Sequence, residues 1–360
     1  MIKEIFSYRL KAARKAMGYS MEKLAREVGI SKQMISKYEK GKSLPGSDLL
    51  IKLSEVLGVL PGYFFEKPVV VANEIKFRKN SKLPKREQEK IMFFMAQRLE
   101  KYLLVENILG MDSRFISPLK EGEENLLKRF NPANAERLAE TVRKNWEIGK
   151  DPIANVIYLL EEFRIKVIEI ENKDKEDNRF DGLASIMDNE IAVIVTKKHD
   201  YVERKRFTLL HELGHLLINR YAKNSLDEKT EEAFCNRFAG AMLLPREVVI
   251  EYFGRKPRAL YLSELAFVQE KYGISIRAIM YRLKDLGIIS ERKLQSFFRH
   301  LNGNKNYKKL IDKERFPGNE ISGRFEALVF KALSEDLITT GKAAELLGTG
   351  LEEVRNKMLM

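Results

Sequence analysis

The sequence predicts a mainly α-helical protein with a small β-sheet, an α+β fold divided among several domains. Apolar residues recur at three- and four-residue intervals along most of the 360 residues, which is typical of amphipathic helices. Only two short stretches, 165–170 and 191–196, have the apolar, β-branched character of strands. The chain is too long for one ordinary domain, so two or three domains are expected, and we divide the sequence into four segments. These are 1–68, 69–133, 134–290 and a helical C-terminal region, 291–360, of unknown role.

Positive charge is concentrated near the N-terminus. The formal net charge is +13, and residues 1–45 hold eleven Lys and Arg against four Glu. Residues 76–101 hold nine Lys and Arg against three Glu, so these two segments account for the whole excess. A localised basic surface indicates binding to a polyanion such as nucleic acid, whereas evenly spread charge would indicate solubility alone.

The cysteine content and the apolar patterning indicate a cytoplasmic protein. The single cysteine, Cys235, excludes an internal disulfide and fits a reducing compartment. We expect Cys235 to be a small buried apolar residue. The first 20 residues lack the pattern of a signal peptide. No apolar run approaches the roughly 18–20 residues of a membrane span, so we expect no membrane partner.

Residues 20–39 predict two short helices joined by a tight turn. Ser20 and Ser31 are suited to cap the two helix N-termini, and Gly29 is suited to end the first helix. The apolar side chains of the two helices would form a shared core of Leu24, Ala25, Val28, Ile30, Ile35 and Tyr38. This pattern predicts an all-α helix-turn-helix domain.

The second of these helices carries the expected DNA contacts. It would expose Lys32, Gln33, Ser36 and Lys37, and Lys40 and Lys42 follow in the next turn. Gln and Lys can read base edges in the major groove, while Lys and Ser can hold phosphates. We therefore expect double-stranded DNA as a partner. A protein-docking domain of the same fold is the alternative, which the localised charge disfavours.

The basic segment continues into a predicted helix over 84–109, which begins at Pro84 and ends before Gly110. One module reads few base pairs, so a homodimer is expected. This helix could pair with its twin in such a dimer, or it could pack on the domain that follows. Residues 111–133 are rich in loops.

The sequence His211-Glu-Leu-Gly-His215 matches the pattern H-E-x-x-H within a predicted helix over 202–219. Residues four apart share one helix face, so both imidazoles can bind a single Zn²⁺. Glu212 can then act as the general base toward a water that the ion activates. One zinc ion per chain is expected.

A catalytic zinc site needs a third protein ligand and one open position. The next predicted helix, 228–243, offers Glu232 as that ligand, and Asn236 lies four residues further on the same face. Asn236 would orient one of the histidines by a hydrogen bond. Glu231 points elsewhere on the helical wheel and is the weaker candidate.

Peptide hydrolysis also requires a place for the substrate. If the strand 191–196 lies at a sheet edge, an extended peptide could add to it through main-chain hydrogen bonds. Tyr201, Arg204 and Arg206 are the polar residues nearby in the sequence, and the pattern does not favour one of them as the oxyanion donor.

Residues 8–65 resemble the Cro/cI-type helix-turn-helix domain of the xenobiotic-response-element (XRE) family. The resemblance rests on Ile35-Ser-Lys-Tyr-Glu39, Gly41 and Pro45. Met21 departs from the family, which usually has a DNA-contacting Gln at that place. The resemblance implies an operator-binding regulator.

Residues 134–290 resemble the ImmA/IrrE metallopeptidase family. The resemblance rests on Arg206–His215, Glu232–Ala239, Leu243-Leu-Pro245, Tyr272-Gly-Ile-Ser275, Tyr281-Arg-Leu283 and Leu286-Gly287. It implies a gluzincin-like fold with His211, His215 and Glu232 as zinc ligands and Glu212 as general base. It also implies cleavage of a repressor, often of the XRE type, to relieve repression in mobile elements or stress responses.

Two further stretches, 263–289 and 338–348, read like additional helix-turn-helix units. Residues 263–290 hold four basic and three acidic residues, so no strong positive field is evident, and we interpret both stretches as packing or protein-recognition elements. The whole chain is thus expected to be a DNA-binding regulator with a zinc endopeptidase domain. Two alternatives are a transcription factor whose peptidase-like domain is a non-catalytic sensor, and an antitoxin-like protein that binds a partner.

Overall fold

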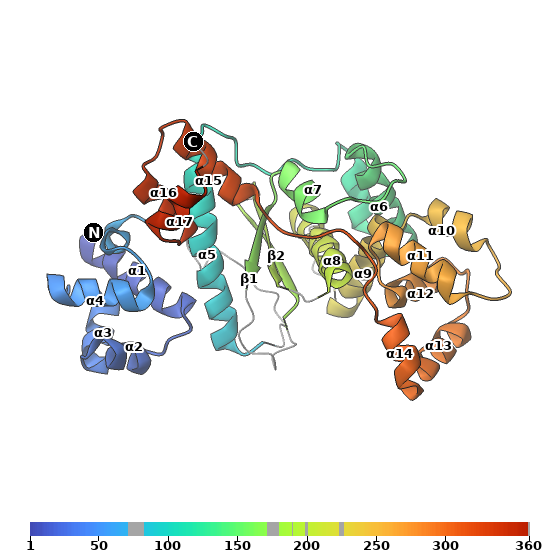
Figure 1. The fold of residues 1–360 in the computed structure, drawn as a ribbon, viewed down its shortest axis with the longest axis horizontal. Coiled ribbons are helices and arrows are strands. Elements are labelled where there is room, and N and C mark those ends of the chain that lie inside the picture. The colour runs from blue at the N-terminus through green and yellow to red at the C-terminus, as the bar shows by residue number, and fades with distance from the viewer. Residues whose placement is uncertain (71–82, 171–179, 189, 199–200, 223–226, 359–360) are drawn as a thin grey trace. The chain divides into compact units, whose positions relative to one another are not determined.

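The computed structural model describes residues 1–70, 83–170, 180–188, 190–198, 201–222 and 227–358 (Figure 1). The chain forms two compact units. Unit 1 consists of Met1–Ser113 and Gly323–Met360, and unit 2 is Arg114–Ser322. The described elements are mostly helices with one small sheet, which confirms the predicted fold class. The predicted segments 69–133 and 291–360 each contribute residues to both units.

Unit 1 begins with a small helical module that has its own core. Ser20 and Ser31 cap α2 and α3 as predicted, because their hydroxyl oxygens accept hydrogen bonds from the backbone N–H groups of Lys23 and Met34. The predicted core residues of α2 and α3 pack together against Phe6 and Leu10 of α1. The elements of the module are α1 (Ile2–Ala16), α2 (Met21–Val28), α3 (Lys32–Glu39), α4 (Ser47–Leu57) and the 3₁₀ helix η1 (Pro61–Phe65).

The long basic helix α5 (Lys85–Ile108) packs within unit 1 on both of its sides. Toward the N-terminal module, Arg9 of α1 donates to both carboxylate oxygens of Glu100. On the other side, Tyr102 and Val105 share a core with the C-terminal helices. Within unit 1, the helix predicted over 84–109 thus packs between the N-terminal module and the C-terminal helices, and its pairing with a twin stays a prediction. The C-terminal helices are α15 (Arg324–Ser334), α16 (Thr340–Leu347) and α17 (Leu351–Asn356).

Unit 2 contains a three-stranded sheet whose order is β1–β3–β2. Strand β3 (Ile191–Lys197) is central, pairing in parallel with β1 (Lys166–Ile170) and antiparallel with β2 (Gly182–Met187). The predicted strands at 165–170 and 191–196 are thus present, and β2 is an addition. Its sequence, Gly-Leu-Ala-Ser-Ile-Met, neither alternates nor is rich in β-branched residues, so no strand was expected there.

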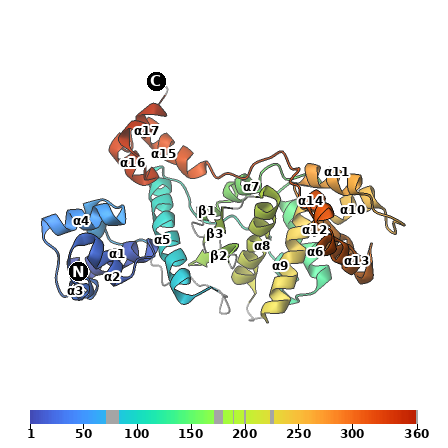
Figure 2. The same cartoon turned by 60° about the horizontal axis from the view of Figure 1, so that its bottom comes forward.

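The helices of unit 2 cover the sheet and build the main core of the chain. Helix α8 lies on β2 and β3, and α9 lies beside α8 in both views (Figures 1 and 2). The predicted helix-turn-helix stretch 263–289 forms α11 and α12, whose apolar side chains are part of this core. The helices are η3 (Glu123–Lys128), α6 (Pro132–Asn145), α7 (Val156–Glu162), α8 (Val202–Tyr221), α9 (Glu228–Leu243), α10 (Arg246–Phe253), α11 (Leu262–Tyr272), α12 (Ile276–Asp285), α13 (Glu291–Gly303) and α14 (Lys305–Ile311).

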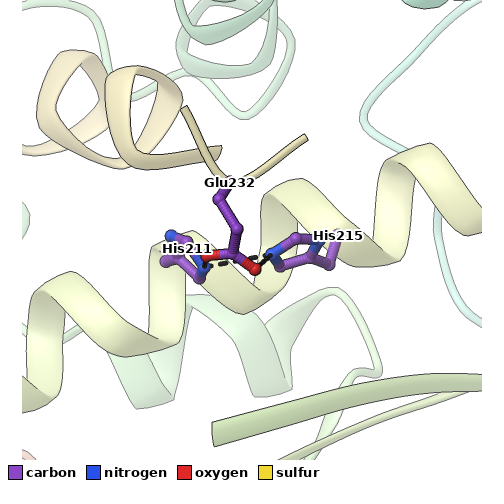
Figure 3. A group of neighbouring side chains, drawn as sticks. All are labelled: His211, His215 and Glu232. Atoms are coloured by element: carbon purple, nitrogen blue, oxygen red, sulfur yellow. Dashed lines mark hydrogen bonds and ion pairs between the residues drawn. The ribbon is translucent and has the colours of Figure 1, made fainter. Parts of the chain in front are cut away.

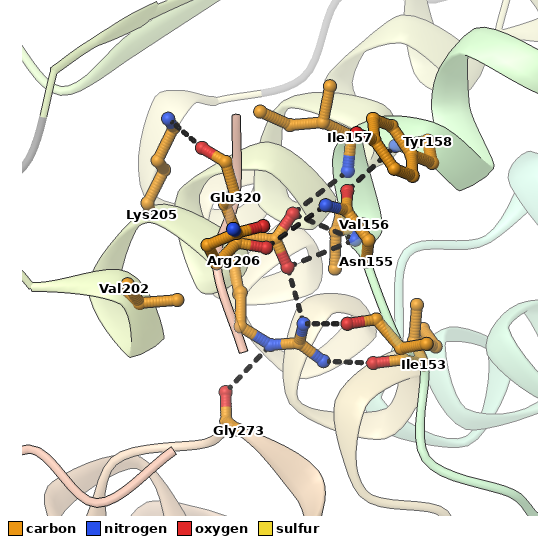
Figure 4. A network of polar contacts seen from close by, with 12 residues as sticks. Ile153, Asn155, Val156, Ile157, Tyr158, Val202, Lys205, Arg206, Gly273 and Glu320 are labelled. Carbon is orange, nitrogen blue, oxygen red and sulfur yellow. Dashed lines mark hydrogen bonds and ion pairs between the residues drawn. The ribbon is translucent and has the colours of Figure 1, made fainter. Parts of the chain in front are cut away.

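A strap of irregular chain, residues 312–322, fixes the first turns of α8 (Figure 4). Glu320 of the strap and Arg206 of α8 form an ion pair whose side chains are both fully buried. The Glu320 carboxylate also accepts the backbone N–H groups of Val156 and Ile157 at 2.9 and 3.0 Å, and so it caps α7. A buried pair satisfied in this way is specific in geometry, and loss of one partner would leave an uncompensated charge. Helix α8 is therefore held firmly just before His211.

Candidate metal centre and nucleic-acid interface

Helices α8 and α9 bring together three side chains that could hold a metal ion (Figure 3). His211 and His215 lie one turn apart on α8, and their Nε2 atoms are 3.0 Å apart. From α9, Glu232 places one carboxylate oxygen 3.2 Å from Nε2 of His211 and the other 3.5 Å from Nε2 of His215. His215 is buried, His211 is nearly so, and the Glu232 side chain is 35% exposed. The three residues predicted as ligands therefore converge.

These side chains are close enough to share one ion. With Zn–N and Zn–O distances of about 2.0–2.1 Å, two ligand atoms of a tetrahedron lie about 3.3 Å apart. The two Nε2 atoms are 3.0 Å apart, each approaches a different oxygen of Glu232, and one ligand atom from each residue lies within 4.8 Å of the others. Two imidazoles and one carboxylate are also a donor set that zinc accepts. Because the Glu232 side chain is partly exposed, the group opens toward solvent on one side.

Close packing of the two helices depends on Gly214, within the H-E-x-x-H stretch. A Cβ atom at this position would lie 3.1 Å from Sγ of Cys235 and 3.2 Å from the ring of Phe238, both on α9. The missing side chain lets α9 approach α8 closely enough for Glu232 to reach the histidines. Cys235 is fully buried in this contact, as expected for a small apolar residue.

The histidine orientation differs from the prediction. Nδ1 of His215 lies 2.6 Å from Oε1 of Glu231, so Glu231 fixes the ring and directs Nε2 toward the other ligands. Asn236 was expected in this role, but it is exposed and makes no hydrogen bond to either imidazole in the described structure. The helical wheel failed here because it treats α9 alone, whereas the rotation of α9 against α8 decides which side chain meets the ring.

The carboxylates around His215 alter its proton affinity. Burial lowers the pKa of His215, but hydrogen bonds to Cys235, Glu231 and Glu232 outweigh burial and raise it to about 11. The surroundings of this ring thus favour a positive charge at the place where a cation is expected to bind.

Glu212 occupies the next position of α8 and is buried against β2. A Cβ atom at Gly182 would lie 2.8 Å from Cγ of Glu212 and 3.0 Å from its Oε1. Gly182 at the start of β2 therefore makes room for this carboxylate, and Glu212 is only 3% exposed. Sequence reasoning missed Gly182, because a glycine signals close approach only once its neighbour in space is known.

The predicted DNA contacts lie on α3 and in the turn after it. Lys32, Gln33 and Lys37 are exposed on α3, Ser36 is half-buried, and Lys40 and Lys42 are exposed beyond its end. These lysines make few contacts within the protein, although Lys32 forms a 2.5 Å ion pair with Glu22 of α2.

The underside of α3 is fixed to the module. Arg14 of α1 and Glu39 form an ion pair with side chains under one-tenth exposed, which holds the end of α3 against α1. Met21, at the place where the XRE family has a DNA-contacting Gln, packs on the core of the module. The polar face of α3 is therefore presented on a rigid base.

Comparisons with known proteins match two parts of the chain. A helix-turn-helix family model matches residues 10–64, and a model described as the IrrE N-terminal-like domain matches residues 160–284. The chain joins an XRE-type helix-turn-helix module to an IrrE N-terminal-like domain. This confirms both resemblances seen in the sequence, and the group of His211, His215 and Glu232 lies within the residues that match the IrrE N-terminal-like domain.

Curated relatives agree with the regulatory assignment. The chain is 26% identical over 165 residues to an HTH-type transcriptional regulatory protein of Pyrococcus furiosus, covering 44% of this chain and 49% of that protein. It is 46% identical over 55 residues to the SPbeta prophage-derived HTH-type transcriptional regulator YonR of Bacillus subtilis, covering 15% and 51%. The chain thus spans about half the length of these relatives. The apo form of the competence regulator ComR from Streptococcus vestibularis aligns over 100% of this chain and 94% of its own at 14% identity, but its TM-score of 0.18 supports no structural argument.

In the IrrE N-terminal-like domain, the strand at 191–197 does not lie at a sheet edge. Strand β3 is central, and the edge strand beside Glu212 is β2. The expectation that a peptide adds to 191–196 was therefore wrong. Of the polar residues considered near the site, Arg206 is fully buried in its pair with Glu320 and cannot meet a substrate. Tyr201 and Arg204 remain exposed.

None of the helices in the described part of the chain is both long and apolar enough to span a bilayer.

Proposed function

We propose that this DNA-binding regulator is a zinc-dependent endopeptidase that cleaves an XRE-type repressor and so relieves repression. The observation that carries the proposal is the convergence of His211, His215 and Glu232 within 3.0–3.5 Å, with a buried Glu212 one residue from His211. Gly214 lets α8 and α9 pack closely, and the Arg206–Glu320 pair holds α8 to the strap. Both contacts support a site whose side chains are in position before a substrate binds.

The residues of this group suit peptide hydrolysis. His211, His215 and Glu232 would hold the ion, and Glu231 would keep the His215 ring in place. Zinc, when bound, supplies a Lewis acid and lowers the pKa of water toward roughly 7. Glu212 would accept a proton from the attacking water and pass it to the amine nitrogen as the carbon–nitrogen bond breaks. Water thus adds across the peptide bond, giving a carboxylate and an amine.

The edge strand β2 favours an extended substrate. Gly182 brings β2 against Glu212, and the sheet order leaves one side of β2 without a strand partner in the described part of the chain. A peptide in extended form could add to that edge through main-chain hydrogen bonds. This binding mode selects an unfolded or loop segment of a protein, which favours an endopeptidase over an enzyme for small amides.

The fusion to a DNA-binding module favours a repressor as substrate. A module that binds an operator raises the local concentration of the attached domain near other proteins bound at the same DNA. Another copy of this chain satisfies the same description, because it carries an XRE-type module of its own. The proposed homodimer would also bring such a copy close.

The test uses full-length protein loaded with Zn²⁺ and two kinds of substrate. One is a tagged copy of the chain carrying Glu212→Gln, and the other is the set of XRE-type repressors encoded in the same genome. We expect the wild-type protein to cleave at least one of them at a defined bond. The Glu212→Gln enzyme, which keeps the metal ligands, and the wild type in EDTA should leave it intact.

The other outcomes separate the alternatives. If no substrate is cleaved and Glu212→Gln leaves regulation in cells unchanged, the proposal fails and a non-catalytic sensor is favoured. If the chain purifies with a second protein at a fixed ratio, without cleaving it, the antitoxin-like function is favoured instead.

A further inference from the structure

Two hollows flank the exposed face of α9 in unit 2. The α12 hollow has a volume of about 570 Å³ and lies among α8, α9, α11 and α12, with Phe207, Gly240 and Tyr281 in its wall. The α6 hollow has a volume of about 560 Å³ and lies beside the start of α6, with Phe130 and Phe234 in its wall. Both volumes lie in the range of ligand sites. The two hollows share Asn236 and Asp285, so they adjoin across α9.

The α12 hollow begins one helical turn from the metal-binding group. Phe207 precedes His211 by four residues on α8, and Asn236 follows Glu232 by four residues on α9. Four residues of helix span about 6 Å, so these residues lie about 6 Å along each helix from a ligand. The hollow therefore borders the place where a peptide bond would be held, near enough for a neighbouring side chain to enter it.

Most charged groups around the α12 hollow form ion pairs within the protein, whereas Glu203 accepts hydrogen bonds from Gln269 and from the backbone N–H of Arg315. Arg277 donates to both carboxylate oxygens of Asp312 at 2.7 Å. Asp285 pairs with Arg237 at 2.8 Å, and Arg204 pairs with Asp181 at 2.8 Å. The remaining wall consists largely of the apolar surfaces of Phe207, Ala278 and Tyr281, which favour an uncharged, apolar ligand.

Asn236 lies where the two hollows meet. Its side chain is exposed and has no hydrogen-bond partner among the described residues. A carboxamide offers both donors and an acceptor, which is the combination needed to bind a peptide main chain. The residue expected to orient a histidine is thus free to bind a substrate, because Glu231 already holds His215.

We propose that the α12 hollow is a specificity pocket for a large uncharged side chain, aromatic or aliphatic, and that Asn236 binds the main chain of the same peptide. The inference rests on the proposed function, since it names the kind of residue that the peptidase selects beside the cleaved bond. The preference follows from burial of apolar surface in a wall whose charged groups are mostly paired within the protein, and it does not depend on turnover.

The experiment measures peptide binding rather than cleavage. The full-length Glu212→Gln protein, loaded with Zn²⁺, is titrated by calorimetry with N-acetyl-Ala-Ala-X-Ala-Ala-amide peptides in which X is Phe, Leu, Asn, Asp or Lys. Burial of a Phe or Leu side chain predicts binding about tenfold tighter than for Asp or Lys. Equal binding of all five peptides, or binding of none, would overturn the proposal.

Two variants connect the preference to this hollow. At Gly240 a Cβ atom would meet only Cδ of Arg282, at 3.5 Å, so Gly240→Ala should be tolerated and should keep the preference. Gly240→Leu should fill the hollow and abolish the preference for Phe and Leu peptides. Because a larger residue here could disturb folding, Tyr281→Ala provides a second variant at a side chain that is 52% exposed. A preference that survives in both folded variants contradicts the proposal.

Asn236→Ala tests the main-chain contact. Loss of one hydrogen bond predicts weaker binding of all five peptides by the same factor, about 2–12-fold, with zinc affinity unchanged. A loss of zinc affinity, or a change confined to one side chain X, would contradict this role. If the peptide preference holds while the wild type cleaves no repressor, the proposed function fails, but the proposal of a pocket for a large uncharged side chain is retained.

Discussion

The helix pairs α2–α3 and α8–α9 place their functional side chains in opposite ways. On α3, the expected DNA contacts are exposed and lie apart from one another, while the apolar side of the helix fixes it to the module. On α8 and α9, the expected ligands are largely buried and contact one another at 3.0–3.5 Å. A site for a long polyanion needs a displayed surface, whereas a site for one ion needs convergence from two helices. The polyanion site tolerates small shifts of the backbone, whereas the single-ion site does not.

The largest difference between the pairs should appear when a ligand is removed. His215→Ala takes away a buried donor, and we expect zinc retention after dialysis to fall from about one ion per chain to nearly none. Binding to random-sequence duplex DNA, measured by fluorescence anisotropy, should stay the same, and EDTA treatment of the wild type should have the same two effects. A parallel loss of DNA binding would show that the two sites depend on each other.

Glu231 should contribute strongly to metal affinity without binding the ion. Glu231→Ala removes the acceptor 2.6 Å from Nδ1 of His215, and we expect zinc affinity to drop about 10–100-fold in a chelator competition titration. Glu228→Ala, an exposed carboxylate in the first turn of the same helix, serves as the matched control and should change little. Equal effects of the two substitutions would indicate a general electrostatic cause.

The close approach of α8 and α9 should be sensitive to one methyl group. Gly214→Ala places a Cβ atom 3.1 Å from Sγ of Cys235, and overpacking of this kind costs about 1–3 kcal/mol in the free energy of unfolding. Cys235→Ala should partly restore the stability of Gly214→Ala in a double-mutant cycle followed by urea denaturation. Gly303→Ala, where a Cβ atom meets nothing within 4 Å, is the control. Additive effects would mean that the helices do not touch as described.

The smallest expected effect belongs to single lysines of the displayed surface. If Lys37 contacts one phosphate, Lys37→Ala should reduce the slope of log affinity against log salt by about 0.9 and leave zinc content unchanged. Lys308→Ala, an exposed lysine of α14 in unit 2, should leave the slope as it is. An unchanged slope for Lys37→Ala would place the DNA on another face of the module.

Local patterns predicted the helices, their caps and two of the strands well. The capping serines, the strands at 166–170 and 191–197 and the spacing of His211 and His215 all depend on neighbours in the sequence, so period and propensity were enough. The choice of Glu232 needed only that the next helix folds back on α8, and the structure brings it to both histidines.

What could not be predicted depends on how elements are rotated and packed. Glu231 rather than Asn236 meets His215, and this depends on how α9 is rotated where it closely approaches α8 at Gly214 and Cys235. Strand β2 and its Gly182 gain their meaning only from Glu212, about 30 residues later in the sequence. The pairing of Arg206 with Glu320 joins residues 114 positions apart, and no local pattern contains such a contact.

The insertion of unit 2 between the two parts of unit 1 imposes an order on synthesis. Lys101 of α5 donates to the backbone carbonyl of Glu345, 244 residues later. On the ribosome, the apolar side of α5 around Tyr102 and Val105 must wait until almost the whole chain has emerged before α15–α17 can cover it. The N-terminal module and unit 2 have cores of their own and can form earlier. The apolar side of α5 therefore stays uncovered until the C-terminal helices have been made.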